Sequence, residues 1–362
     1  MFTVSRKDLG ELLALFRLVE SMSLPLKVKQ NEELSEKVHF SSVMREEGKV
    51  MRKYYLQNDN VCIESTENNH KETIVLPKQE WSEVANHLFE ALRQTDDENL
   101  VLVDDDDEQF LDKAQIYTIA GTNEGQHHLF LETAMGPLLA GVFLRAGAYP
   151  TKILDGGRSA NLKLEQTGTR FASPMAAKVN AFYSDKTIRD RMFMIEDMGS
   201  SLKYSNVADK VFRANLAMID LHLGRLLAEM IRVSYIEDIL KINELTQRMN
   251  EINPLKVKSE LIEKHHYYEF KIKQLLLACI SGMRPAKIYK GQDTLPFYTI
   301  FVNPNGQLFA YSVSNTSDLA DFLYHNTRLE RGDLEKDKYG ELERENNVYY
   351  FKLNLKIGLT KR

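Results

Sequence analysis

The order of secondary-structure signals in the C-terminal part of the chain constrains the fold more than any other feature of the sequence. A helical pattern over about residues 253–282 leads into a basic loop punctuated by proline and glycine, residues 283–291. Two strand patterns follow, joined by Asn303-Pro-Asn-Gly306, and such a link is typical of a turn between paired strands. A short helix, the polar segment 326–330 and a final hairpin complete the chain. This alternation predicts a mixed α and β fold.

Composition places the chain among ordinary soluble proteins. Its 362 residues, 43% hydrophobic content and net charge of −5 allow one large domain or two modest ones. Cys62 and Cys279 lie far apart and offer neither a disulfide framework nor a zinc site, which favours a reduced, cytoplasmic setting. No apolar run approaches the roughly 20 residues that span a bilayer, so we expect no membrane association.

The N-terminal part combines two amphipathic helices with short strands. Apolar residues recur at helical spacing over residues 9–22 and again over 81–93. Between them, residues 50–56, 61–65 and 73–76 have strand patterns with asparagine-rich turns. The acidic run 104–108 is interpreted as a solvated turn or helix start, with metal binding as the alternative.

The central part predicts a core β-sheet followed by long helices. Strand patterns occupy residues 116–120, 128–133, 142–145, 151–154 and 160–165. Asp155-Gly-Gly-Arg158 between the last two predicts a hairpin, because consecutive glycines accept positive φ. Beyond Ser205, an apolar stripe from Phe212 to Ile231 predicts a helix that packs on the sheet, and residues 246–253 predict a break before the next helix.

Three phrases in the C-terminal part resemble HpaII-type type II restriction endonucleases. They are Gly282-Met-Arg-Pro-Ala-Lys287, Asn326-Thr-Arg-Leu-Glu330 and the pair Tyr339-Gly340 with Tyr350-Phe-Lys-Leu-Asn-Leu355. The opening helix at residues 9–19 also resembles the family's opening helix. The resemblance implies a restriction-endonuclease-like α/β (α+β) fold: a mixed central β-sheet flanked by long helices, with a strand-rich C-terminal portion.

The resemblance also implies a division of labour along the chain and an activity. We expect an N-terminal α+β region at 1–110, a nuclease-like core at 111–250 and a DNA-recognition region at 251–362. The expected activity is cleavage of a short site in double-stranded DNA by Mg²⁺-dependent phosphodiester hydrolysis. Since symmetric DNA sites are usually bound by symmetric proteins, we expect a homodimer, with a cognate DNA methyltransferase in the same system.

Metal-dependent cleavage of DNA needs carboxylates to hold Mg²⁺, and often a lysine. On a strand these groups share a face only at alternate positions, as do Asn161, Lys163 and Glu165. Lys163 falls where the family has its catalytic lysine, whereas Asn161 replaces the expected serine or acid. We therefore predict that Lys163 is catalytic, with Glu165 as an assistant.

The family's first aspartate has no direct counterpart, because His128 stands in its place. A histidine can ligate a metal or act as a general base, so His128 is a catalytic candidate. Asp155 and Glu132 are the carboxylates that could supply the metal ligands and complete the catalytic set.

Each of these residues also has a structural interpretation. Asp155 is typical of a hairpin turn. Lys163 and Glu165 could each belong to a cross-strand ion pair at the surface, and His128 could be an ordinary half-buried strand residue. An inactive nuclease fold is the consequence if the structural interpretations hold.

Sequence-specific contact with DNA needs paired donors and acceptors for the bases and cations for the phosphates. Three polar clusters supply this chemistry: one after the strand at 160–165, the basic loop and the polar segment 326–330. A solvated basic loop and a helix C-cap are the alternative interpretations of the last two. The predicted DNA-binding residues are Arg170, Lys178, Asn180, Arg284, Lys287, Lys290, Asn326, Thr327 and Arg328.

Two other functions remain open at this point. One is a DNA-binding protein that keeps the nuclease scaffold without cleavage, suggested by the missing aspartate. The other is an unrelated interaction protein, favoured by the acidic net charge. Salt-sensitive DNA binding would exclude the second, and Mg²⁺-dependent cleavage would exclude the first.

Overall fold

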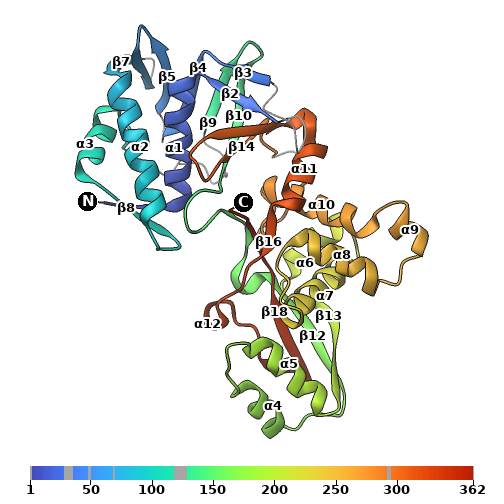
Figure 1. The fold of residues 1–362 in the computed structure, drawn as a ribbon. Helices are drawn as coiled ribbons and strands as arrows, with labels where there is room; N and C mark the ends of the chain where they lie inside the picture. The colour runs from blue at the N-terminus through green and yellow to red at the C-terminus, as the bar shows by residue number, and fades with distance from the viewer. Residues whose placement is uncertain are drawn as a thin grey trace. The chain divides into compact units, whose positions relative to one another are not determined.

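Residues 2–27, 36–47, 50–67, 70–117, 129–291 and 295–361 are described by the computed structural model. They form two compact units built from interleaved segments of the chain (Figure 1). The first unit comprises Met1–Thr151, Thr294–Leu319 and Thr360–Arg362, and the second comprises Lys152–Asp293 and Ala320–Leu359. These two units do not test the functional regions expected at 1–110, 111–250 and 251–362, so those regions stay a prediction.

The first unit is organised around a mixed sheet of ten strands, in the order β3-β2-β15-β14-β10-β9-β4-β5-β6-β7. The pairs β10–β14 and β15–β2 are parallel, and the others are antiparallel. The strands are β2 (Ser23–Leu26), β3 (Glu36–His39), β4 (Ser42–Glu47), β5 (Val50–Gln57), β6 (Asn60–Glu67), β7 (His70–Pro77), β9 (Leu129–Thr133), β10 (Gly136–Leu144), β14 (Tyr298–Val302) and β15 (Leu308–Ser312).

Helices α1 (Arg6–Ser21) and α2 (Lys78–Gln94) lie side by side in this unit (Figure 1). Trp81 of α2 stacks on Phe16 of α1 with ring centroids 4.1 Å apart, and its indole N–H donates to the Phe16 carbonyl. Asp104 caps α3 (Asp105–Lys113), so the acidic run is a helix start, as predicted. A two-stranded sheet, β1 (Phe2–Ser5) with β8 (Leu100–Val103), completes the unit.

The second unit contains two antiparallel sheets, and the chain passes from one to the other at two places. The three-stranded sheet is β11 (Lys152–Asp155), β19 (Lys356–Leu359) and β16 (Thr327–Leu329). The four-stranded sheet is β13 (Ser200–Val207), β12 (Asn161–Gly168), β18 (Val348–Asn354) and β17 (Leu342–Glu345). The chain passes from one sheet to the other between β11 and β12, through a 3-10 turn at Gly157–Ala160, and again at Leu355 between β18 and β19.

Helix α7 (Leu223–Ile236) packs against the four-stranded sheet. A Cβ atom at Gly224 would lie 2.4 Å from the Tyr204 hydroxyl oxygen, so glycine permits this close approach. The apolar side chains Leu162 and Leu164 of β12 are buried on this side. The remaining helices are α4 (Ser173–Asn180), α5 (Thr187–Asp197), α6 (Lys210–Ile219), α8 (Ile242–Ile252), α9 (Ser259–Glu263), α10 (Tyr267–Ile280), α11 (Thr316–His325) and α12 (Leu334–Asp337).

The predicted fold class is confirmed: the protein is a mixed α/β structure with a large mixed sheet. The predicted strands at 50–56, 61–65 and 73–76 correspond to β5, β6 and β7. The helices at 9–22 and 81–93 are α1 and α2. The strand pair joined by Asn303-Pro-Asn-Gly306 is β14–β15, and the final hairpin is β17–β18.

Two predictions about the central sheet are wrong. The strands between residues 129 and 168 do not form one sheet but belong to three. Asp155-Gly-Gly-Arg158 is not a hairpin, because β11 pairs with β19 whereas β12 pairs with β13 and β18. Two glycines permit a tight reversal but do not choose which strands pair. The predicted strand 116–120 extends beyond the described residues, and His128 lies outside them.

Three helix boundaries also differ from the prediction. The stripe from Phe212 to Ile231 is divided after Ile219, where α6 ends. Residues 246–253 are not a break but lie mostly within α8, which ends at Ile252 and is followed by the left-handed residue Asn253 with φ of 49°. The long helix expected from residue 253 therefore begins only at Tyr267, after the short helix α9. No helix within the described ranges combines the length and apolarity needed to cross a membrane.

Candidate active site

The polar face of the four-stranded sheet carries the lysine predicted to be catalytic. Asn161, Lys163 and Glu165 alternate with buried leucines along β12, so they share the face opposite α7, as predicted. On the neighbouring strand β18, Asn354 is directly opposite Asn161, and Lys352 is directly opposite Lys163. This face therefore concentrates amides and ammonium groups where apolar residues would be expected in a covered sheet.

Lys163 pairs with a carboxylate that the sequence analysis did not select. Its Nζ atom lies 2.7 Å from both carboxylate oxygens of Glu345 on β17 and 5.5 Å from the ring centroid of Tyr350. Glu165 instead lies directly opposite Lys203 on β13. A phosphate that approached Lys163 would compete with Glu345 for its ammonium group.

Asp155 is brought together with a lysine that the sequence analysis did not select. Asp155 ends β11 and is directly opposite Lys356 on β19, with 3.2 Å between its Oδ1 atom and Nζ of Lys356. Lys152 is a more distant partner at 3.6 Å. The structure thus joins Asp155 to Lys356, whereas Lys163 is joined to Glu345.

A second carboxylate completes this group. Nζ of Lys356 lies 2.9 Å from Oδ2 of Asp337, a residue with only 4% of its surface exposed. Burial opposes the charged form of Lys356, but the hydrogen bond to Asp337 and the charge of Asp155 raise its pKa on balance. Lys356 therefore stays charged between two carboxylates.

Two asparagines line the same region and are held in fixed orientations. Nδ2 of Asn354 donates to Oδ1 of Asn161 and to the Gly157 carbonyl. Nδ2 of Asn161 donates to the carbonyls of Asp337 and Lys338. Oδ1 of Asn354 has no hydrogen-bond partner, although only 3% of the Asn354 surface is exposed.

Sequence reasoning missed Asp337, Asn354 and Lys356. One signal could have found two of them: Asn354-Leu-Lys356 repeats the spacing and residue types of Asn161-Leu-Lys163. Asp337 lies in a run of alternating charges, 332–338, whose members look alike in the sequence.

Glu132 belongs to the ten-stranded sheet of the first unit and not to the sheet that holds Lys163. Its carboxylate contacts Nζ of Lys53 at 2.5 Å and accepts a hydrogen bond from the Ser42 hydroxyl at 2.7 Å. The hydrogen bond from Lys53, followed by that from Ser42, lowers the pKa of Glu132. Glu132 is thus an ionised, paired strand residue, and its catalytic role stays a prediction, as does that of His128.

The donor atoms beside Lys356 suit a hard divalent cation. Mg²⁺ prefers oxygen ligands and is usually held by one or two carboxylates together with water and substrate phosphates. Asp155 and Asp337 provide two carboxylates, and Asn354 provides an amide oxygen without a partner. Within the described residues, no group of three or more His, Cys, Asp or Glu side chains could hold a metal ion. The observed set offers two carboxylates and one amide oxygen, so it would leave the other positions around such an ion to water and phosphate.

Four of the predicted DNA-binding side chains are hydrogen-bonded to the protein backbone. Asn180 bonds both the N–H and the carbonyl of Leu342. Arg284 donates to three backbone carbonyls, including that of Ile153. Asn326 and Thr327 donate to carbonyls of the preceding helix turn, which is the cap interpretation of that segment.

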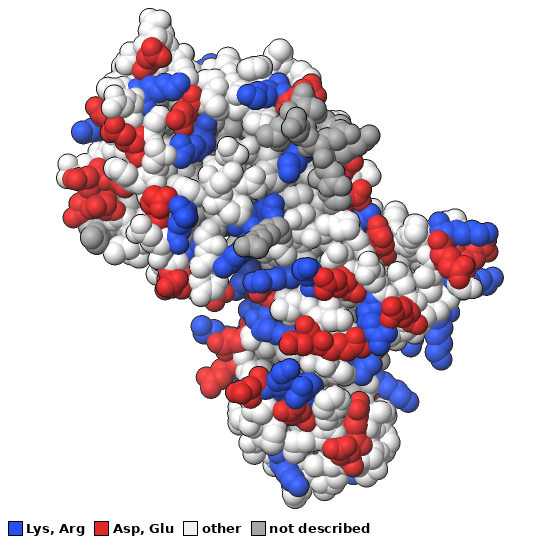
Figure 2. Space-filling view, viewed as in Figure 1, with Lys and Arg blue, Asp and Glu red and all other residues white. Residues whose placement is uncertain are grey.

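The other predicted DNA-binding side chains are on the surface. Arg170, Lys178, Lys287 and Lys290 are exposed, whereas Arg328 is 37% exposed and pairs with Glu330. Lys and Arg side chains alternate with Asp and Glu over the face drawn in Figure 2, so charge on this face is mixed. Phosphate binding must therefore depend on local groups of cations.

The basic loop 283–291 is anchored by a buried residue that sequence reasoning also missed. The Asn215 side chain, 2% exposed, donates to the carbonyls of Arg284 and Lys287 and accepts from the N–H of Tyr289. Pro285 packs on Gly156, where an added Cβ would lie 2.3 Å from the proline Cγ. The loop is thus fixed directly beside the Asp155 turn.

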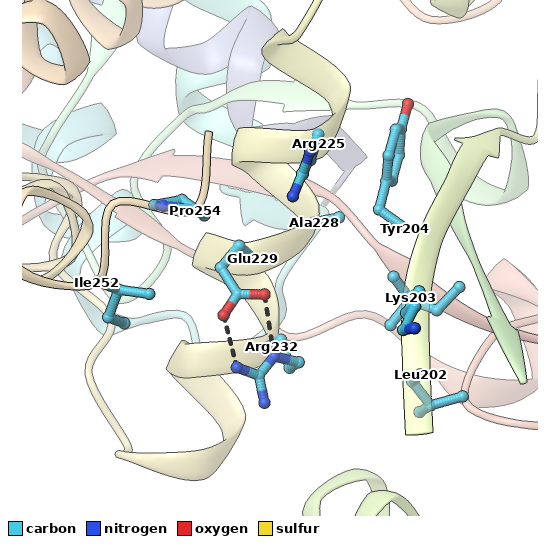
Figure 3. Close-up of a pocket in the computed structure, with 10 residues that line it drawn as sticks. Leu202, Lys203, Tyr204, Arg225, Ala228, Glu229, Arg232, Ile252 and Pro254 are labelled. Atoms are coloured by element: carbon cyan, nitrogen blue, oxygen red, sulfur yellow. Dashed lines mark hydrogen bonds and ion pairs between the residues drawn. The ribbon is translucent and has the colours of Figure 1, made fainter. Parts of the chain in front are cut away.

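A cavity of about 570 Å³ opens between α7 and the four-stranded sheet (Figure 3). Arg225 and Arg232 of α7 line it, together with Lys203 and Tyr204 of β13. Arg232 is paired with Glu229, and Arg225 is the other guanidinium there. One carboxylate among several cations suits a phosphate better than a metal ion.

Comparison with known proteins gives matches that cover nearly the whole chain. The sequence profile of the family described as "HpaII restriction endonuclease" matches residues 5–359. The chain is 25% identical over 361 residues to the type II restriction enzyme HpaII of Haemophilus parainfluenzae, covering 98% of this chain and 98% of that protein. No solved structure matches the chain.

Proposed function

Because the chain belongs to the HpaII restriction endonuclease family, we propose that it is a type II endonuclease that cleaves double-stranded DNA within a short specific sequence. The observation that carries this proposal is the extent of the family match, residues 5–359, which includes segments of both units. A match of that extent covers the candidate active-site residues and the basic loop alike.

The proposed reaction is hydrolysis of one phosphodiester bond in each strand. A water oxygen forms a bond to phosphorus, the bond from phosphorus to the leaving oxygen breaks, and the leaving oxygen takes a proton. Mg²⁺, when bound, would supply positive charge to the phosphate and lower the pKa of the attacking water. Asp155 is the carboxylate of the second unit that we propose as a ligand for this ion.

Lys163 is proposed as a lysine that contacts the scissile phosphate. It is 20% exposed on a polar sheet face, and its ion pair with Glu345 would be exchanged for one with the phosphate. Glu165 shares that face and is the proposed assistant. Roles for Glu132 and His128 remain part of the proposal.

The exposed cations are the proposed contacts to the DNA backbone. Lys287 and Lys290 stand on the loop held by Asn215 beside the Asp155 turn. Arg170 and Lys178 follow the strand that carries Lys163. Base recognition by Asn180, Arg284, Asn326, Thr327 or Arg328 would require internal bonds to be exchanged for bonds to bases.

A homodimer, a cytoplasmic setting and a cognate DNA methyltransferase complete the proposal. A symmetric DNA site is matched most simply by a protein with the same two-fold symmetry. A nuclease of this kind also needs its own sites in the host DNA to be protected, which a methyltransferase of the same specificity would do.

A second candidate function is a DNA-binding protein of the same fold that does not cleave. It is suggested only by the departure from the family motif, such as Asn161 at the position where an acid or serine was expected. Binding without cleavage would be the observation that distinguishes it.

Incubation of the purified protein with unmethylated phage DNA and Mg²⁺ tests the proposal. We expect discrete fragments from the wild-type protein, no fragments with EDTA, and a loss of at least tenfold in rate with Lys163→Ala. Lys271→Ala is the matched control, because Lys271 is 19% exposed and pairs with one carboxylate, Asp220. Intact DNA with a salt-sensitive mobility shift would favour the non-cleaving function, and no shift at all would exclude both.

A further inference from the structure

The two chain crossings of the second unit bring four polar residues to one place. Asp155 and Lys356 form the last pair of the three-stranded sheet, and Asn161 and Asn354 form the first pair of the four-stranded sheet. Between these pairs the two chain segments cross from one sheet to the other, and the Leu355 N–H donates to the Ala160 carbonyl. Such a crossing leaves side chains beside a break in the hydrogen-bond ladder.

Helix α12 adds a buried carboxylate at this break. Asp337 ends α12, and its Oδ2 accepts hydrogen bonds from the Asp333 N–H and from Lys356. Its Oδ1 lies 3.5 Å from the position that a Cβ atom on Gly157 would occupy. Asp337 thus faces the crossing itself, and it is only 4% exposed.

One ammonium group joins the two carboxylates at the crossing. Lys356 contacts both Asp155 and Asp337, and Lys152 is a further partner of Asp155. A buried carboxylate is costly unless it is paired and hydrogen-bonded. Asp337, the buried carboxylate, is paired with Lys356, so a divalent cation that displaced this ammonium group would keep Asp337 paired.

An unpartnered amide oxygen points to the same cation. Both amide hydrogens of Asn354 are used, by Gly157 and Asn161, so its orientation is fixed and its Oδ1 is the atom without a partner. A Cβ atom added to Gly332 would lie 3.1 Å from this oxygen and 2.8 Å from Oδ2 of Asp337. The two oxygens therefore lie on the same side of Gly332, together with the Tyr339 ring, whose Cε1 atom would be 2.8 Å from the same Cβ position.

We propose that Asp155, Asp337 and the amide oxygen of Asn354 form the divalent-cation site of this protein, and that Lys356 is the group with which the cation competes. The proposal rests on the nuclease function proposed above and identifies the cation site of that reaction. Its ligand is a hard divalent cation that prefers oxygen, such as Mg²⁺ or Mn²⁺. A purely structural ion-pair cluster is the competing explanation.

The first test maps the cation without using DNA. Ferrous iron can replace such ions, and with ascorbate and peroxide it produces hydroxyl radicals that cut the nearby polypeptide backbone. We expect cuts near Asp155, near residues 332–337 and near residues 354–356, all suppressed by excess Mg²⁺. Cuts elsewhere, such as beside Glu132 alone, or no cuts at all, would overturn the proposal.

The second test measures Mn²⁺ affinity of folded variants by calorimetry. Asp337→Asn keeps the shape of the side chain, and we expect affinity to fall by at least the roughly 10- to 100-fold that the loss of an outer-shell partner costs at metal sites. Lys356→Met removes the competing ammonium group, and we expect affinity to rise. A structural cluster predicts no change in affinity in either variant, even where stability falls.

Lys273→Met is the matched control for the lysine change. Lys273 also bridges two carboxylates of the second unit, those of Glu269 and Asp321, at 2.5 Å each. We expect the control to leave Mn²⁺ affinity unchanged. An increase equal to that of Lys356→Met would show a general effect of net charge and would overturn the assignment.

The outcomes separate this inference from the proposed function. DNA cleavage that survives Asp337→Asn, with iron cuts elsewhere, would sink the cation site and leave the nuclease function standing. Iron cuts at the three predicted segments, with no DNA cleavage under any condition, would support the cation site and remove the nuclease function.

Discussion

Asn161 and Asn354 lie opposite each other on β12 and β18, and the amide nitrogen of Asn354 donates to Oδ1 of Asn161 over 2.7 Å. The amide nitrogen of Asn161 in turn donates to the carbonyls of Asp337 and Lys338. Only a side chain that both donates and accepts can make these bonds, and an ionised acid cannot donate. Local hydrogen bonding thus explains an asparagine where the family resemblance implies a serine or an acid.

Asn161→Asp should therefore damage the protein and not restore a motif. The new carboxylate would face two carbonyl oxygens in a site that is 2% exposed, and we expect a loss of about 2–4 kcal/mol in unfolding free energy. Chemical denaturation measures this loss. Asn206→Asp is the control, because the Asn206 side chain accepts a hydrogen bond from the Val207 N–H, and a carboxylate can accept the same bond. We expect a change within about 0.5 kcal/mol. A more active Asn161→Asp enzyme would contradict the account.

Lys163→Ala should leave the fold nearly as stable as before. Lys163 is 20% exposed and Glu345 is 41% exposed, so their ion pair is largely screened by water. We expect the unfolding free energy to fall by less than about 1 kcal/mol. Denaturation of the variant beside the wild type measures it. A much larger loss would mean that any loss of cleavage in this variant reports unfolding and not chemistry.

Asn215→Ala should release the basic loop. Its three hydrogen bonds to the backbone of Arg284, Lys287 and Tyr289 are lost, and we expect destabilisation of roughly 2–4 kcal/mol. Trypsin should then cut after Lys287 or Lys290 many times faster than in the wild type. Equal rates at these two lysines would show that the loop is held in another way.

The double change Lys287→Ala with Lys290→Ala tests the proposed DNA contact. Each phosphate contact adds about 0.9 to the slope of log affinity against log salt concentration, so we expect the slope to fall by roughly 2. Lys264→Ala is the control, since Lys264 is 71% exposed but pairs with Glu260. Fluorescence anisotropy over a salt series measures the slopes, and an unchanged slope in the double variant would place the DNA elsewhere.

Glu11 should make stability depend on pH. Burial raises the pKa of Glu11 from an ordinary 4.5 to about 7, and its Oε1 has no hydrogen-bond partner. The folded state therefore holds a proton more tightly than the unfolded state, so stability is lost as pH rises through this range. At pH 8 the penalty is on the order of 3 kcal/mol.

Glu11→Gln removes this ionisation while keeping the size of the side chain. We expect the variant to be more stable than the wild type at pH 8 and close to it near pH 4.5. Calorimetric melting at the two pH values measures both differences. A difference that does not vary with pH would contradict ionisation as the cause.

Local signals in the sequence were sufficient for much of the fold. The helix at 9–22, the strands from Val50 to Pro77 and the final hairpin have strong periodicity and turn residues, and their main contacts are with sequence neighbours. Pairing at long range could not be read in the same way. β11 and β12 are adjacent in sequence, yet Asp155 pairs with Lys356 some two hundred positions away.

The residues of the candidate site also fall into those that local signals could group and those that only long-range pairing brings together. Asn161, Lys163 and Glu165 share a face because alternation on a strand is a local property. Asp337 and Lys356 reach Asp155 only through the crossing between two sheets and through a helix as short as Leu334–Asp337. No periodicity within the sequence marks such a meeting of distant segments.

The interleaving of the two units sets the order in which the protein can be completed during synthesis. In the first unit β14 lies between β10 and β15, and β15 in turn pairs with β2, so the ten-stranded sheet stays divided until residue 312 has been made. The edges of β10 and β2 must wait while the ribosome makes residues 152–293 of the second unit. At roughly 5–20 residues per second, that wait is about 7–30 seconds. During it the nascent chain exposes open strand edges, which are the surfaces that holding chaperones protect.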